Sequence, residues 1–465
     1  MSKPNILMII TDQQRWDALS CVSDWLETPN MDRIAAEGVR FSNCVTNAPV
    51  CIPTRLSLAT GHYPHNTGVW DNQDHTLSPD CPTWMQAVRD AGYRTSLFGK
   101  THLHPHGGDL RDREHLMHSY GLDDVDEIGG PRASARCLSY MTAMWEEKGL
   151  WDAYKADFDE RFSNKPWVTR PSTLPFDDYA DVYVGQQAKK YLTGYDRDQP
   201  WFCWVSFGGP HEPWDTPEPH YSRYNPEDMP DPVAAPEDDR ERPQGLLDAK
   251  QKIPFEPGEE KLLRANYAGN VALIDDQIGE IFDVIEQRGE MNNTVVVLTS
   301  DHGEMNGDYG FIYKSNLLNG AVRVPLLIRT PGTASSDVAG SVCDSPIEWF
   351  DAGPTLVELA GGELDFRQFA KSACPVLEDP TREHRTEAIS EYGGEIMLLD
   401  REWKIALNRE GQPYLLFNVQ EDPGEVNNLA GLPEMAEVEN QLRLRILDRV
   451  ASSQVLSGAH FALGT

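Results

Sequence analysis

Short apolar runs that stop abruptly at polar residues constrain the fold of this chain more than any other feature. Residues 6–10 (ILMII) and 295–298 (VVVL) are continuous apolar runs, as expected of strands buried on both faces of a parallel sheet. The first run leads to Asp12 and the second to Asp301. Because the carboxyl ends of parallel strands meet at one edge of a doubly wound sheet, these carboxylates are expected to lie close together. Taken alone, Asp12 reads as a turn residue.

Two further strand-like stretches place basic residues at the same edge. Residues 95–98 precede Lys100 and His102, which are two positions apart and so point to one side of an extended segment. Residues 201–207 (WFCWVSF) precede His211, which stands near two prolines. Alone, the first two residues are more simply explained as solvated surface groups, and the histidine as part of a rigid loop.

The length of the chain and the positions of its turn-forming residues predict two structural parts. A chain of 465 residues is too long for one small core. Residues 1–375 predict an α/β domain, a large mostly parallel sheet sandwiched by helices, with long insertions at about 103–200 and 215–260. Residues 376–465 predict a smaller α+β subdomain, because four short strand-like pieces separated by Gly, Asp and Pro precede a helical stretch at 434–450.

Charge and composition restrict the partners. The chain has 41 basic and 74 acidic residues, a net charge of -33, which argues against nucleic acid or an anionic membrane as partner. No apolar run approaches the ~20 residues of a membrane span, and the first residues do not resemble a signal peptide. We therefore expect a cytoplasmic protein. The long insertions would suit a homo-oligomeric interface.

Cys51 opens the sequence CIPTRLSLATG, which predicts a reactive group near a helix N-terminus. Pro53 suits the first helical turn, and residues 54–60 read as a short helix ended by Gly61. Cys51 would then lie in the turn before the helix, where free N–H groups favour an anion or a thiol of lowered pKa. Arg55 could bind a tetrahedral oxyanion beside it. On spacing alone, a buried structural cysteine is the simpler interpretation.

Four sequence motifs carry a family resemblance. The Cys-x-Pro-x-Arg core followed by Leu-x-x-Thr-Gly resembles the signature of the type I sulfatases, in the alkaline phosphatase superfamily. GYRTSLFGKTH is similar to the second signature of this family, PHEPW to a loop whose histidine contacts the leaving-group oxygen, and SDHG to a third, metal-binding motif. The resemblance covers most of the chain and implies an alkaline-phosphatase-like fold. It is thinnest at 103–200 and 215–260.

The resemblance implies hydrolysis of a small-molecule sulfate monoester to an alcohol and sulfate. Cys51 would be converted by a formylglycine-generating maturation enzyme to formylglycine (3-oxoalanine), whose hydrate is the nucleophile. One hydroxyl would attack sulfur, and loss of the proton from the second would release sulfate. The resemblance also implies one divalent metal ion, held by Asp12, Gln13, Cys51, Asp301 and His302.

It further implies roles for the basic residues. Arg55, Lys100 and Lys314 would neutralise charge on the sulfuryl oxygens. His211 or Lys314 would protonate the departing alkoxide, and His102 would take the proton from the second hydroxyl. The sequence around Lys314 matches the family less well, because it lacks a Tyr-Glu pair often found there.

Two ligand positions depart from the commonest sulfatase pattern. Gln13 and His302 stand where many sulfatases carry Asp and Asn, so the site is less anionic and softer. Calcium is favoured on family grounds, with manganese as the alternative.

The same departure raises a second functional hypothesis. The Asp-Gln and Asp-His pattern resembles the phosphonate monoester and phosphodiester hydrolases of the superfamily, and Asn72 falls where those enzymes place a substrate-binding asparagine. Lys100 and His102 resemble the sulfatase pair instead. We therefore rank a sulfatase first and a phosphonate or phosphodiester hydrolase second, with promiscuity between them expected. A non-catalytic protein on this scaffold should have lost a charged site residue, and none is lost.

Overall fold

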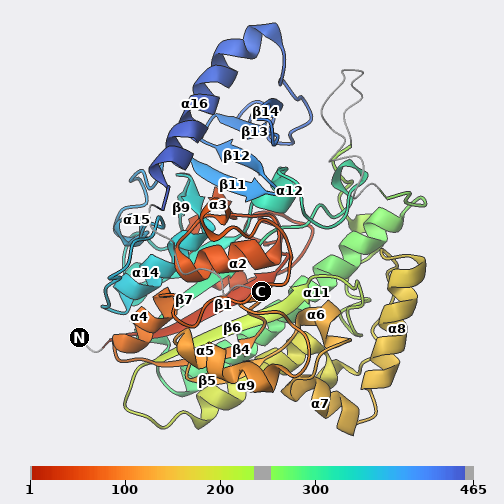
Figure 1. Cartoon of the computed structure of the whole chain (residues 1–465). Helices are drawn as coiled ribbons and strands as arrows, with labels where there is room; N and C mark the ends of the chain where they lie inside the picture. The colour runs from red at the N-terminus through yellow and green to blue at the C-terminus, as the bar shows by residue number, and fades with distance from the viewer. Residues whose placement is uncertain (1–2, 235–252, 456–465) are drawn as a thin grey trace.

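A mixed eight-stranded sheet forms the centre of the molecule (Figure 1). The structure is a computed structural model and describes residues 3–234 and 253–455. In spatial order the strands are β5 (Asp124–Glu127), β4 (Arg94–Gly99), β6 (Trp201–Pro210), β1 (Asn5–Asp12), β7 (Thr294–Ser300), β8 (Leu326–Arg329), β2 (Val39–Phe41) and β9 (Ser341–Cys343).

The sheet is parallel from β5 to β7, and β8 runs antiparallel to both of its neighbours. β1 lies between β6 and β7, with Ile6 paired to Phe202 on one side and to Val295 on the other. All eight residues of β1 are buried. The predicted mostly parallel sheet is therefore confirmed.

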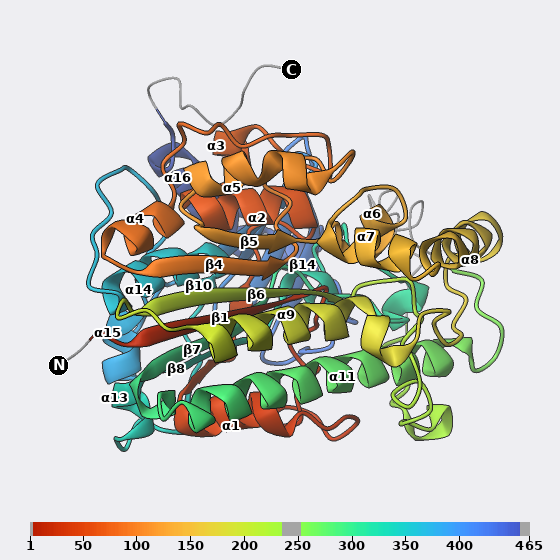
Figure 2. The ribbon, with the colours of Figure 1, turned by 90° about the horizontal axis from the view of Figure 1, so that it is seen from below.

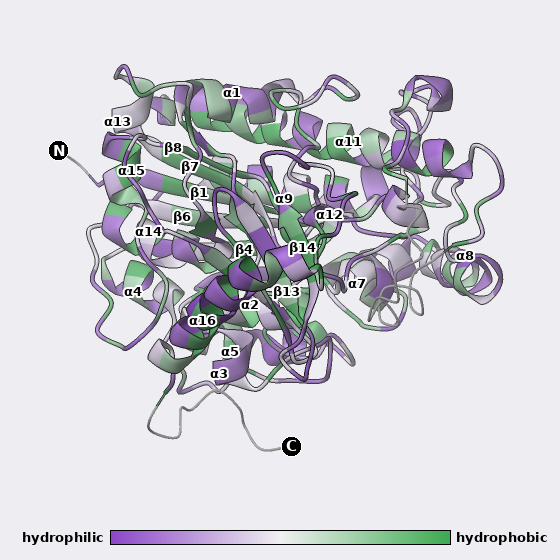
Figure 3. Cartoon of the chain, turned by 90° about the horizontal axis from the view of Figure 1, so that it is seen from above, coloured by the Kyte–Doolittle hydropathy of each residue, from purple (hydrophilic) through white to green (hydrophobic). Residues whose placement is uncertain are grey.

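Helices cover both faces of this sheet (Figure 2). One face packs against α1 (Pro29–Glu37), α9 (Ala180–Gly194) and α11 (Glu259–Gln287), the other against α2 (Cys51–Thr60), α4 (Trp84–Asp90) and α14 (Ala352–Leu359). The alternation of β1 side chains explains the two cores: Leu7 and Ile9 join the first, whereas Ile6, Met8 and Ile10 join the second. Figure 3 shows hydrophobic residues gathered along the central strands.

The C-terminal part is an antiparallel sheet with one long helix, as predicted (Figure 1). Helix α16 places Leu442 and Ile446 against one face of the sheet. The predicted boundary between residues 375 and 376 falls inside α15 (Cys374–Glu378), so a division there stays a prediction. The elements are β11 (Ala388–Tyr392), β12 (Glu395–Leu399), β13 (Trp403–Leu407), β14 (Pro413–Asn418) and α16 (Ala436–Ser452).

A buried ion pair within the C-terminal part lies at its junction with the main domain. Lys404 of β13 contacts the Glu425 carboxylate at 2.5 Å, and both side chains are almost fully buried. Glu425 also accepts the backbone N–H of Asn319 at 2.7 Å, at the start of α12 (Asn319–Val322). Tyr309 donates its hydroxyl to the Gly424 carbonyl at 2.6 Å. The C-terminal sheet is thus fastened to the segments on both sides of Lys314.

The insertion at 103–200 contains more regular structure than the expected loops. Trp145 and Tyr154, on two of its helices, are buried against the same core as α9, which stabilises helices that lack a clear sequence period. The second insertion, 215–260, lies partly outside the described residues. The helices preceding α9 are α5 (Glu114–Ser119), α6 (Gly130–Ser134), α7 (Tyr140–Glu147) and α8 (Trp151–Asn164).

Short elements complete the fold. β3 (Cys44–Val45) pairs with β10 (Ile347–Glu348) in a separate two-stranded sheet, α3 (Pro64–Thr67) follows α2, and α13 (Pro331–Ala334) follows β8. Within the residues described, no helix combines the length and the apolar character that crossing a membrane requires.

Candidate active site

Four residues from three separate segments converge at the carboxyl edge of the sheet. Asp12 ends β1, Asp301 and His302 follow β7, and Cys51 begins α2. Their carboxylate, imidazole and thiol atoms lie within 4.8 Å of one another. All four side chains are buried. The convergence expected from the apolar runs is therefore present.

Cys51 lies in the first turn of α2, not in the turn before it as predicted. The reason is that the first turn closes at Val50, whose carbonyl accepts the Thr54 N–H at 3.4 Å. Pro53 occupies the third helical position, where its missing N–H costs nothing. Gly61 ends the helix with φ 68°, as expected. The Cys51 sulfur lies 3.1 Å from Nε2 of His302.

Asn72 caps this helix from an exposed loop. Its side-chain oxygen accepts the backbone N–H of Ile52 at 2.9 Å, so it satisfies one of the free donors of the first turn. The structure therefore places Asn72 against the residue next to Cys51.

The surroundings of Cys51 favour an anion. Burial and the Asp12 carboxylate oppose ionisation, but the positive charges of Lys100, Lys314 and His302 outweigh them and lower the pKa of the Cys51 thiol. The Lys100 ammonium lies 3.8 Å from the sulfur. Position 51 thus offers a negatively charged group a net attractive field.

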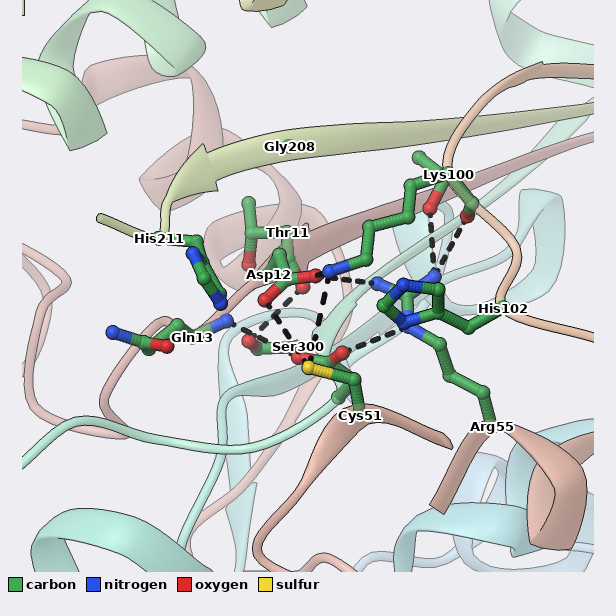
Figure 4. A network of polar contacts seen from close by, with 12 residues as sticks. Thr11, Asp12, Gln13, Cys51, Arg55, Lys100, His102, Gly208, His211 and Ser300 are labelled. Carbon is green, nitrogen blue, oxygen red and sulfur yellow. Dashed lines mark hydrogen bonds and ion pairs between the residues drawn. The ribbon is translucent and has the colours of Figure 1, made fainter. Parts of the chain in front are cut away.

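Arg55 and Lys100 hold the two carboxylates (Figure 4). The Arg55 guanidinium binds Asp301 at 2.8 Å and Asp12 at 3.2 Å, and it donates to the Lys100 carbonyl at 2.7 Å. The Lys100 ammonium contacts Asp12. Burial opposes the charge on Lys100, but Asp12 and Cys51 raise its pKa, so it stays protonated.

His102 lies beside Arg55 and Lys100 with its backbone in the left-handed region, at φ 59°. Burial first, and the Lys100 charge second, lower the pKa of His102 well below its usual value. Its Nδ1 is buried without a hydrogen-bond partner among the residues described. The ring is therefore neutral at pH 7 and able to accept a proton.

His211 and Lys314 form a second basic pair. His211 donates Nδ1–H to the Glu212 carbonyl at 2.8 Å, so Nε2 accepts from the Lys314 ammonium at 2.8 Å. Burial and the Lys314 charge lower the pKa of His211 well below its usual value. His211 is consequently neutral, and its Nε2 is the acceptor in this pair.

The loop that carries His211 is fixed by Asp181 of α9. Its Oδ1 accepts the backbone N–H groups of Gly208 and Gly209 at 2.8 and 2.9 Å. Burial raises the pKa of Asp181 to about 6. The end of β6 thus depends on a buried carboxylate that the sequence analysis did not single out.

Gln13 faces away from the four-residue cluster (Figure 4). Its backbone N–H donates to Asp301 at 3.1 Å, and the Tyr267 hydroxyl donates to its carbonyl at 2.8 Å, which hold its φ at 74°. The side-chain oxygen contacts Lys314. The side-chain NH2 donates to Glu212 at 2.9 Å and to Glu304 at 2.5 Å.

Glu212 and Glu304 are site residues that the sequence analysis missed. Both are buried, and Arg132 contacts the Glu212 carboxylate. Burial and the charge of Glu212 raise the pKa of Glu304 to about 7. The available signal was position: each directly follows a recognised motif residue, in PHEPW and SDHGE.

The donor set of the cluster fits a divalent metal ion. Two buried carboxylates and one imidazole, with position 51 beside them, offer both oxygen and nitrogen ligands. Such a set suits manganese as well as calcium. Burial opposes ionisation of both carboxylates, but nearby positive charges, Arg55 and Lys100 among them, lower the pKa of Asp12 and of Asp301, so both are anionic and able to act as ligands.

The fold and the site at the strand ends assign this chain to the alkaline phosphatase superfamily. Comparison with known proteins identifies the family within it. The chain belongs to the sulfatase family, whose model matches residues 4–362. A second model, the C-terminal region of N-sulphoglucosamine sulphohydrolase, matches residues 307–452. The predicted class of enzyme, a sulfuric ester hydrolase, is thereby confirmed.

Relatives that match over nearly their full length include both sulfatases and a phosphonate monoester hydrolase. An arylsulfatase of Clostridium perfringens is 28% identical, covering 95% of this chain and 93% of the relative. A multifunctional alkaline phosphatase superfamily protein of Trinickia caryophylli is also 28% identical, covering 94% and 93%. The crystal structure of a phosphonate monoester hydrolase of Agrobacterium radiobacter has a TM-score of 0.80 at 26% identity, covering 97% of this chain and 96% of that one.

Proposed function

We propose that the enzyme hydrolyses a sulfate monoester, using residue 51 as formylglycine. The observation that supports this most directly is the convergence at Cys51. Two carboxylates and an imidazole lie within 4.8 Å of its sulfur, and Arg55 and Lys100 bind the same carboxylates. The thiol here occupies the position that the hydrate of the aldehyde would take. A formylglycine-generating enzyme must then act on Cys51 before the protein is active.

The metal ion in this proposal is calcium, with manganese as the alternative. Asp12, Asp301 and His302 would hold it beside residue 51. When bound, it would lower the pKa of a hydroxyl at position 51 and polarise a sulfuryl oxygen. Gln13 joins these ligands only if its amide turns from Lys314 and Glu304 toward the cluster.

The remaining residues divide the work of charge and proton transfer. Arg55 and Lys100 neutralise the equatorial sulfuryl oxygens in the transition state. Lys314 carries the proton shared with His211 and gives it to the departing alkoxide. His102, neutral and buried, accepts the proton of the second hydroxyl at position 51, and sulfate leaves as the carbonyl reforms.

Phosphonate monoester hydrolysis is the second candidate. It is favoured by the Gln13 and His302 pattern and by the structural likeness to a phosphonate monoester hydrolase. Lys100 and His102 favour the sulfate ester, because they resemble the pair in the second sulfatase motif, GYRTSLFGKTH.

The test compares kcat/KM for 4-nitrophenyl sulfate and for the matched 4-nitrophenyl phenylphosphonate. We expect the sulfate to be the better substrate. A large phosphonate preference would reverse the ranking. Peptide mass spectrometry of residue 51 in protein from the native host should find formylglycine. An unmodified thiol throughout would contradict the proposed nucleophile, and Cys51→Ala, which cannot be converted, serves as the inactive control.

A further inference from the structure

One buried carboxylate organises the histidine-rich stretch that follows Lys100. Glu127, at the end of β5, is 5% exposed. It contacts Nε2 of His104 at 2.8 Å and Nε2 of His106 at 3.2 Å, and it accepts the hydroxyl hydrogen of Thr101. The threonine and the two histidines all lie within five positions of His102, in the sequence THLHPH.

His102 depends on this group for its place. Its backbone N–H donates to Nε2 of His106 at 3.2 Å, and the two rings lie 4.3 Å apart at their centroids. Its own Nδ1 has no partner among the described residues. A left-handed backbone costs a non-glycine residue roughly 1 kcal/mol, so His102 needs outside contacts to remain at φ 59°.

The hydrogen-bond directions are consistent with one arrangement. His106 donates Nδ1–H to the Gly129 carbonyl at 3.1 Å, which leaves Nε2 to accept from His102. The Glu127 oxygen 3.2 Å from this nitrogen therefore receives no hydrogen bond from it, and Glu127 is held instead by Thr101 and His104. Burial is the first cause that lowers the pKa of His106 and keeps this nitrogen unprotonated. His104 carries the balancing charge, because Glu127 raises its pKa against the effect of burial.

We propose that Glu127 is a positioning residue for His102, acting through Thr101 and His104 on either side of it in the chain. This inference rests on the proposed function, in which His102 acts after the alcohol has left. The carboxylate fixes the residue directly before His102 by accepting the Thr101 hydroxyl hydrogen, and it fixes the residue two positions after His102 through the ion pair with His104. A second metal centre is not the explanation, since in residues 3–234 and 253–455 only the Asp12 cluster brings three metal-binding side chains close enough together.

Glu127→Gln tests the proposal with 4-nitrophenyl sulfate under rapid mixing. The amide is isosteric and keeps one acceptor oxygen, but it removes the charge that pairs with His104. We expect kcat to fall on the order of 10–100-fold, as displacement of a catalytic group by about 1 Å would produce. Release of the first equivalent of nitrophenol should stay fast, so a burst appears or grows. General structural damage would instead reduce the burst amplitude.

Asp126→Asn is the matched control. Asp126 precedes Glu127 on β5, faces the opposite side and accepts the Tyr183 hydroxyl at 2.8 Å. This variant should keep wild-type kcat and show no added burst. Thr101→Val is the second test variant, because it removes only the hydroxyl that Glu127 accepts. It should also slow the step after nitrophenol release, and lower kcat by a smaller factor than Glu127→Gln does.

The outcomes separate this proposal from the function on which it rests. A wild-type enzyme that does not hydrolyse sulfate esters contradicts the proposed function. An active wild type with Glu127→Gln unchanged in both burst and steady state overturns the positioning role. If Glu127→Gln does not fold, Thr101→Val decides, and wild-type turnover in that variant overturns the proposal.

Discussion

The two ends of the site are built on different electrostatic plans. At the end that holds Cys51, called the nucleophile end after its proposed role, Arg55 lies between the carboxylates of Asp12 and Asp301, so opposite charges alternate. The end that holds His211 and Lys314 is called the leaving-group end after their proposed role. There Glu212 and Glu304 both accept hydrogen bonds from the side-chain NH2 of Gln13, and each carboxylate disfavours the negative charge on the other. The first arrangement strongly holds a fixed geometry. The second leaves protons to be shared, which suits general acid catalysis.

The nucleophile end should be the more sensitive to loss of one charge. Arg55→Ala removes the only guanidinium that binds both carboxylates among the described residues. We expect kcat/KM to fall about 10³-fold or more, and stability to fall by about 3–5 kcal/mol because two buried carboxylates lose their partner. Enzyme kinetics and urea unfolding measure the two effects. The exposed Arg136→Ala serves as control, and an unchanged rate in Arg55→Ala would mean that the site is assigned wrongly.

The leaving-group end should respond according to the alcohol released. Lys314→Met removes the proton shared with His211. We expect kcat/KM to fall about 10²–10³-fold for an alkyl sulfate, whose alkoxide needs a proton, and much less for 4-nitrophenyl sulfate. Lys155→Met, on the outer surface of α8, is the control. Equal losses for both substrates would contradict the role of Lys314 as the acid.

The smallest expected effect is a change in Tm, and it concerns Asp181, which supports the loop that carries His211. The pKa of Asp181 is about 6 against a usual 3.8, so the folded protein holds this proton more tightly than the unfolded chain. Its contribution to stability is therefore greatest below pH 4 and is lost as the pH rises through 6. Asp181→Asn keeps the acceptor for Gly208 and lacks the charge. Its Tm relative to wild type should rise by a few degrees between pH 5 and pH 8.

Scanning calorimetry across this pH range checks the prediction. Asp283→Asn, at an exposed position of α11, should leave the pH dependence unchanged. A constant difference in Tm between Asp181→Asn and wild type at every pH would show that Asp181 does not change its protonation there.

The same contrast explains how far the sequence could predict the site. Asp12 and Asp301 were predictable because each follows a buried strand, and parallel strands align their ends. The side-chain direction of Gln13 was not, because its partners Glu212, Glu304 and Lys314 are 199, 291 and 301 positions away in other loops. Periodicity and motif spacing contain no information about which loop side chains meet.

Local detail near Cys51 shows the same limit on a smaller scale. Gly61 and Pro53 correctly predicted a helix, but its start depends on the Val50 carbonyl and on Asn72, which caps from a loop twenty residues away. The division of residues 39–45 between β2 and β3 also depends on a contact from outside this segment. Ser42 donates its N–H to the Cys343 carbonyl at 2.9 Å, which turns the chain between the two sheets.

The buried pair of Lys404 and Glu425 links the C-terminal sheet to the segment that carries Lys314, the proposed acid. Through Glu425 it anchors Asn319, only five residues beyond Lys314. A shortened protein ending before β13 would lose both charged partners and release the segment that presents the acid. Chimaeras between this enzyme and its relatives should therefore exchange the C-terminal sheet together with residues 303–322, as one inherited unit.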